Sequence, residues 1–132
     1  MIMAERRRQI TKEKWAAKHD AERHADGSLS EAAACYERCA RFQDHCGRFP
    51  TEATDAFKFE PLDWPWEPQW FKLGGSAVRT YVKAGALFQA EIDRILKLFL
   101  KQGRKHSHDV RRLVIARSSL VRITGTLDRL LK

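Results

Sequence analysis

The sequence contains few residues that break helices. It has only 7 Gly and 4 Pro among 132 residues, and all four Pro fall between positions 50 and 68. Ala, Leu, Arg, Lys and Glu, which favour helix, dominate the remainder. A hydrophobic content of 43% is typical of a globular chain and not of a disordered one. We therefore expect a single all-α domain over residues 1–132.

Long apolar runs are also absent. No stretch approaches the roughly 18 residues that a membrane-spanning helix needs. The basic start, Met1–Arg8, is not followed by the continuous apolar region of a secretory signal. Cysteine is scarce and odd in number, with 3 residues that all lie between positions 35 and 46, which favours free thiols in a reducing compartment. These features predict a cytoplasmic protein with no membrane partner.

Motifs for catalysis or cofactor binding are missing. The chain has no phosphate-binding glycine loop, no CxxC pair and no nucleophile elbow around a serine. Cys35, Cys39, His45 and Cys46 resemble a set of metal ligands, but about 16 Å of helix would separate Cys35 from Cys46. Their spacing fits buried thiols, and a metal held by Cys35 and Cys39 or a redox role is the alternative. We expect no enzymatic activity, no cofactor and no metal.

Hydrophobic periodicity predicts four helices, over residues 12–25, 29–47, 76–102 and 109–131. The third keeps strict heptad spacing from Val78 to Phe99, and the fourth from Leu113 to Leu130. The short connector between them predicts a long antiparallel hairpin over residues 76–131 within a small bundle of about four helices. Residues 1–10 are expected to form a basic flexible arm. The heptad seams also allow an alternative, a homo-oligomer paired through these two helices.

Aromatic residues gather in the Pro-rich segment 49–73, which predicts an irregular crossover between helices. Trp and Phe are frequent at interface hot spots, so this segment is a candidate partner-binding site. The alternative is that its rings pack over one end of the bundle. Acids at positions 60, 63 and 67 argue against stacking on nucleic-acid bases there. The candidate partner-binding residues are Trp64, Trp66, Trp70 and Phe71.

Acidic residues are rare in the last 59 positions. Residues 74–132 hold 13 Lys and Arg against four acids, a net charge of +9, whereas residues 1–73 hold 12 against 13. Such asymmetry indicates a polyanionic partner, most simply a nucleic-acid backbone, DNA or RNA, contacted through phosphates. At 3.6 residues per turn the cations of the third helix fall on one face, opposite the apolar seam. The predicted phosphate track comprises Arg79, Lys83, Arg94, Lys97, Lys101, Arg104, Lys105, Arg111, Arg122 and Arg129.

Two other interpretations of the basic face stay open. The chain could be a protein-interaction module, an adaptor or inhibitor, that docks this face on an acidic protein partner. The cations could also simply form the solvent-exposed faces of two amphipathic helices, with no partner. The overall profile is generic for small helical subunits of nucleoprotein complexes and for phage or mobile-element proteins, and no motif identifies a family. We expect a non-enzymatic nucleic-acid-binding protein that works as one subunit of a larger assembly.

Overall fold

A computed structural model describes residues 1–12, 27–46, 64–66, 70–103 and 107–132. The described residues form four α-helices and no strand: α1 (Ile2–Lys12), α3 (Ser28–Cys46), α5 (Ala77–Gln102) and α6 (Ser107–Leu130). The predicted all-α helical bundle is therefore confirmed. Residues 13–25 of the helix expected over 12–25, and most of the 49–73 crossover, lie outside the described residues.

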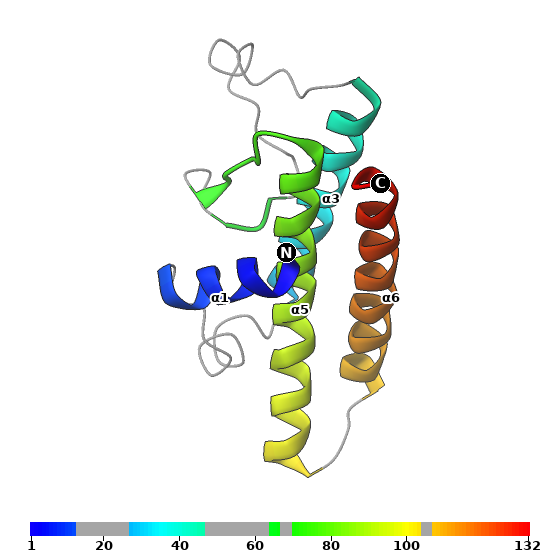
Figure 1. Ribbon diagram of the computed structural model, residues 1–132. Coiled ribbons are helices and arrows are strands. Elements are labelled where there is room, and N and C mark those ends of the chain that lie inside the picture. Colours follow the sequence, from blue (N-terminus) through cyan, green and yellow to red (C-terminus); the bar gives the residue numbers. More distant parts are fainter. Residues whose placement is uncertain (13–26, 47–63, 67–69, 104–106) are drawn as a thin grey trace.

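The central element is α5, against which α1, α3 and α6 all pack (Figure 1). Its start is set by Ser76, whose side chain accepts a hydrogen bond from the backbone N–H of Arg79 at 3.2 Å. Its end is set by Gly103, which adopts a left-handed φ of 69° and donates its N–H to the carbonyl of Phe99. The predicted helix over residues 76–102 agrees with these bounds.

The core lies where α3 and α6 meet α5. Tyr81, Phe88, Ile92 and Ile95 of the predicted heptad seam are buried, as are Ile123 and Leu127 of α6. The other side of α5 is buried as well, at Ala86, Leu87 and Ala90. Three neighbouring helices thus enclose the middle of α5. The sequence pattern had predicted one buried apolar seam and one solvent-exposed face.

The predicted flexible arm over residues 1–10 is instead part of helix α1, which lies across α5 (Figure 1). Glu5, Arg6 and Gln9 are buried in this contact, although all three are polar. Arg6 forms an ion pair of 3.3 Å with Asp93 of α5. The close approach needs Gly85, because a Cβ there would lie 2.6 Å from Cδ1 of Ile2. The run of cations predicted an unbound arm, but Glu5, which is its single acid, and Ile2 attach it to α5.

Candidate functional site

The predicted phosphate track is interrupted at its centre by Arg94. This residue is 0% exposed, and its guanidinium is ion-paired with Glu91, which is equally buried. Glu91 also accepts a hydrogen bond of 3.2 Å from Ser30 of α3. The expectation that Arg94 faces solvent is therefore wrong. Ala86 and Ala90, which share its face, are small enough for neighbouring helices to approach, and both are buried.

Arg79 and Lys83, at the start of the predicted track, are held by other groups of the same molecule. Arg79 forms an ion pair of 2.6 Å with Glu5 of α1. The ammonium of Lys83 donates a hydrogen bond of 2.6 Å to the backbone carbonyl of Lys72. Burial would raise the pKa of Glu5, but the hydrogen bond from Arg8 and the charge of Arg79 outweigh it and hold the pKa below its ordinary value of 4.5. Glu5 is thus a carboxylate that neutralises part of the expected positive surface.

On α6, Arg122 and Arg129 also pair with carboxylates. Arg122 donates two hydrogen bonds, of 2.7 and 2.8 Å, to Glu37 of α3. The hydrogen bond to Glu37 raises the pKa of Arg122, so this guanidinium stays charged. Arg129 donates one hydrogen bond of 3.0 Å to Asp44. Both arginines therefore connect α6 to α3, in addition to the contacts that each helix makes with α5.

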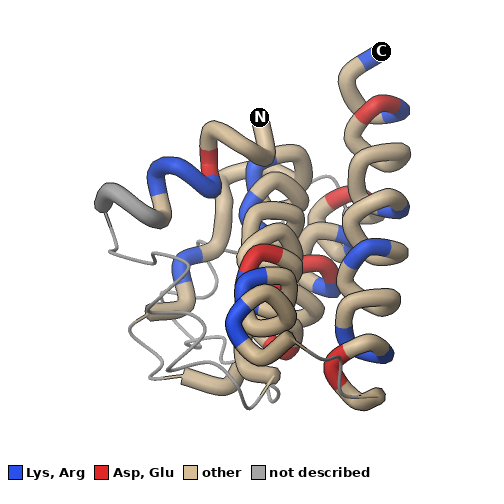
Figure 2. Tube along the Cα trace, turned by 90° about the horizontal axis from the view of Figure 1, so that it is seen from below, with Lys and Arg blue, Asp and Glu red and all other residues tan. Residues whose placement is uncertain are grey.

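Of the predicted track, Lys97, Lys101 and Arg111 remain as exposed cations with no ion pair to any described residue. Arg104 and Lys105 lie outside the described residues. Figure 2 shows Lys and Arg segments spread over the helices, with Asp and Glu segments between them. The continuous cationic ridge expected from sequence is therefore absent from the described part of the chain. Helical periodicity gave the helix on which each cation lies. It could not show which cations meet carboxylates of α1 and α3.

The four candidate partner-binding aromatics divide into two groups. Trp64 and Phe71 pack around the ring of Tyr36, with centroids 5.4 and 5.2 Å from it, and Trp66 lies edge-on to Trp64. These three are partly buried against the core, as the alternative of packing over the bundle expects. Trp70 differs, since 51% of its surface is exposed. It is therefore the one of the four that remains open to a partner.

Cys35 and Cys39 are buried thiols on one face of α3, in agreement with a structural role. A hydrogen bond with Cys35 lowers the pKa of Cys39, against the opposing effect of burial. No group of three or more His, Cys, Asp and Glu residues is placed to hold a metal within the described ranges. The side chain of Cys46 lies outside them.

The least expected exposed surface is the C-terminal end of α5, which extends beyond the other described helices (Figure 1). Leu96 is 46% exposed and Leu100 is 87% exposed, and Lys97 and Lys101 alternate with them. We call these four residues the α5 tip. At 100° per residue, Leu96 and Leu100 continue the side of α5 on which α1 packs further up the helix. The heptad pattern of this helix could not show that the neighbouring helices stop short of Leu96.

No family model, curated protein or solved structure matches the chain. Among the described residues, none of the helices combines the length and apolar character needed to cross a membrane. The α5 tip is one apolar surface that the other described helices leave uncovered, and Leu100 is the most exposed of the large hydrophobic residues in the described part of the chain.

Proposed function

We propose that the protein is an interaction module, an adaptor or inhibitor, that docks the α5 tip on an acidic protein partner. The observation that carries this proposal is the 87% exposure of Leu100 at the projecting end of a helix otherwise buried along its middle. A leucine at such a position contributes nothing to the core, and clustered exposed apolar residues mark interaction surfaces. The partner would bury Leu96 and Leu100 in an apolar groove.

The charges around the α5 tip specify the chemistry of this partner. Lys97 and Lys101 are the charged residues of the segment 96–102, and no acid accompanies them. Since like charges across an interface cost affinity, the groove should be bordered by Asp or Glu. The carboxylates would pair with the two ammonium groups at the rim, which mainly speeds association, while the leucines supply the affinity.

Retrieval of partners from the native host tests the proposal. The tagged chain would be compared with Leu96→Ser/Leu100→Ser and with Lys97→Glu/Lys101→Glu, each with and without nuclease. The matched control is Val121→Ser, because Val121 is 73% exposed on α6, away from the α5 tip. We expect a nuclease-resistant acidic protein that both double variants lose and the control retains. Retention by both double variants would contradict the proposal.

Nucleic-acid binding is the second candidate, and a specific observation favours it. Lys97, Lys101, Arg111 and Arg117 are exposed, and none of them pairs with a carboxylate in the described part of the chain. Phosphates could therefore occupy them without first breaking an ion pair. Gel shifts with mixed oligonucleotides at 50 and 300 mM salt separate the candidates. Binding that Lys97→Glu/Lys101→Glu weakens but Leu96→Ser/Leu100→Ser leaves unchanged would favour the nucleic acid.

A further inference from the structure

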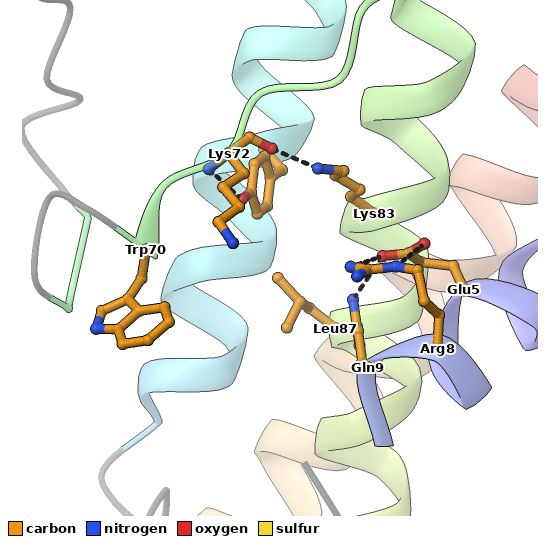
Figure 3. A pocket seen from close by; sticks show the side chains of 8 residues that line it. Glu5, Arg8, Gln9, Trp70, Lys72, Lys83 and Leu87 are labelled. Carbon is orange, nitrogen blue, oxygen red and sulfur yellow. Dashed lines mark hydrogen bonds and ion pairs between the residues drawn. The ribbon is translucent and has the colours of Figure 1, made fainter. Parts of the chain in front are cut away.

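The hollow beside α1 is too small for a ligand. Its walls include Glu5, Gln9 and Lys83 (Figure 3), and the space between them has room for about one water molecule. Its charged groups are already engaged, since Arg8 pairs with Glu5 and Lys83 donates to the backbone carbonyl of Lys72. A contact with another molecule is therefore argued from an outer face of the bundle.

The exposed side of α6 carries apolar residues that none of the other described helices covers. α6 packs on α5 and lies at the edge of the bundle (Figure 1). Val114, Val121 and Leu131 each expose more than half of their surface. Leu131 continues the last turn, because its N–H donates to the carbonyl of Leu127 at 2.9 Å. Apolar side chains exposed along one helix face indicate contact with another molecule.

These residues belong to a second heptad seam on α6. Its members follow one another in steps of four and three residues, which is the spacing of the a and d positions of a coiled coil. At 100° per residue they lie about 100° around the helix from the buried residues Ala116, Ile123 and Leu127. All of them are exposed. The second seam consists of Val114, Arg117, Val121, Thr124, Asp128 and Leu131.

The polar members of the second seam limit what can cover it. Arg117 and Asp128 have no ion pair with a described residue. The hydroxyl of Thr124 donates to the carbonyl of Leu120 at 2.8 Å, so it needs no partner from another molecule. The cation and the acid are eleven residues apart on one face. A complementary helix must therefore carry the same two charges in the reverse order.

A second copy of the chain supplies that order when it lies antiparallel. In such a pair a positions face d positions, and in one register every member of the second seam has a partner. A parallel pair would set Arg117 against Arg117 and Asp128 against Asp128, and a shift of one heptad separates the two charges. The pairings of the favoured register, each made twice by symmetry, are Val114 with Leu131, Arg117 with Asp128, and Val121 with Thr124.

The borders of the second seam permit close packing. Leu113 and Leu120, which pack partly against the core, border it on one side and extend its apolar surface. Gly125 borders it on the other side, where an added Cβ would meet nothing within 4 Å. Arg122, further around the helix, is already paired with Glu37, which reduces repulsion between the two copies.

We propose that two copies of the chain associate through the second seam, as an antiparallel pair of α6 helices. The contact from Val114 to Leu131 would be about 26 Å long and about 10 Å wide. A standard interface takes roughly 800 Å² from each partner, so this contact is small and the dimer should be weak. The proposal does not rest on the function proposed for the α5 tip, which lies on another helix.

Sedimentation velocity of the full chain between about 10 µM and 1 mM tests the dimer. We expect Val121→Ser and Arg117→Glu each to weaken self-association about 10-fold or more. The matched controls are Ile115→Ser and Arg111→Glu, which should associate as the parent does. Each control is exposed on α6 six residues before its counterpart, about 120° around the helix. Circular dichroism at low micromolar concentration, where a weak dimer dissociates, confirms that each variant is folded.

Charge exchange tests the orientation and the register. Asp128→Arg should also weaken self-association, because it faces Arg117 of the other copy. An equimolar mixture of Arg117→Glu and Asp128→Arg should associate as the parent does, since each charge then meets its opposite on the other chain. A mixture that associates no better than either variant alone would overturn the proposal.

Other occupants of the second seam are outcomes that count against the dimer. A parent chain that stays monomeric at 1 mM would overturn the proposal. The same holds if that monomer binds vesicles of anionic lipid and Val121→Ser abolishes the binding, since a membrane surface would then cover the seam. Val121→Ser also separates the two proposed surfaces, because it should lose the dimer and retain the acidic partner of the α5 tip.

Discussion

Arg122 of α6 and Glu37 of α3 form a two-point ion pair, with N–O distances of 2.7 and 2.8 Å. These two helices pack chiefly on α5 and not on each other. The pair therefore connects two helices whose main contacts are with a third. Glu37 is nearly buried while Arg122 is about half exposed, so the guanidinium bridges the surface and the interior. An arginine that sequence periodicity assigns to nucleic acid is thus part of the fold.

Removing Arg122 tests this structural role. We expect Arg122→Gln to lower the free energy of unfolding by about 1 kcal/mol, because Glu37 loses two hydrogen bonds but keeps the one from Arg41. Urea unfolding followed by circular dichroism measures the change. Arg117→Gln is the matched control, since Arg117 is exposed on the same helix without an ion pair to a described residue, and should be neutral. A double-mutant cycle with Glu37→Gln showing no coupling would contradict the pairing.

The buried pair of Arg94 and Glu91 should be far more sensitive. Both side chains are fully buried, so Arg94→Met leaves an uncompensated carboxylate in the core. We expect a loss of about 3–5 kcal/mol in unfolding free energy, which is much of the stability of a small domain. The double variant Arg94→Met/Glu91→Gln removes the charge that was left behind and should recover part of the loss. Equal unfolding midpoints for the single and double variants would contradict this account.

The sequence was sufficient to predict α3, α5 and α6, but it did not predict α1 or which side chains meet when the helices pack. The heptad spacing predicted the range of α5 closely, because periodicity is a local property of the chain. The environment of Arg94 is not local, since it depends on Ser30 and Glu91, which only the packing of α3 on α5 brings together. The same applies to Leu100, whose exposure depends on where α1 and α6 end. Charge and hydropathy patterns give the face of a helix but not what covers it.

Acidic pH should detach α1 from α5, because it protonates the Glu5 carboxylate. The pKa of Glu5 in the folded chain lies below its ordinary value of 4.5, so its carboxylate stabilises the fold fully above that pH. The stabilisation is lost as the pH falls through the lowered folded-state pKa, because protonation removes the partner of Arg8 and Arg79. Hydrogen exchange of the α1 amides between pH 3 and 6 measures the release.

Glu5→Gln is the control for that titration, since it mimics the protonated group at every pH. We expect α1 of this variant to exchange faster at pH 6 and to lose most of the pH dependence. A variant whose α1 exchange follows the same pH curve as the parent, after correction for intrinsic exchange rates, would show that another group controls docking. Asp93 of α5, the partner of Arg6, is the first group to substitute in that event.

Two helical glycines should respond differently to substitution by alanine. At Gly125 of α6 an added Cβ meets nothing within 4 Å, so Gly125→Ala should stabilise the chain by roughly 0.5–1 kcal/mol through helix propensity. At Gly85 of α5 the same Cβ lies 2.6 Å from Cδ1 and 3.0 Å from Cγ1 of Ile2. The Ile2 side chain must turn away or α1 must move, which cancels the gain. Gly85→Leu, for which no rotation of Ile2 makes room, should undock α1 and expose its amides to exchange. Protection of α1 that is unchanged in Gly85→Leu would show that α1 does not cross α5 at this glycine.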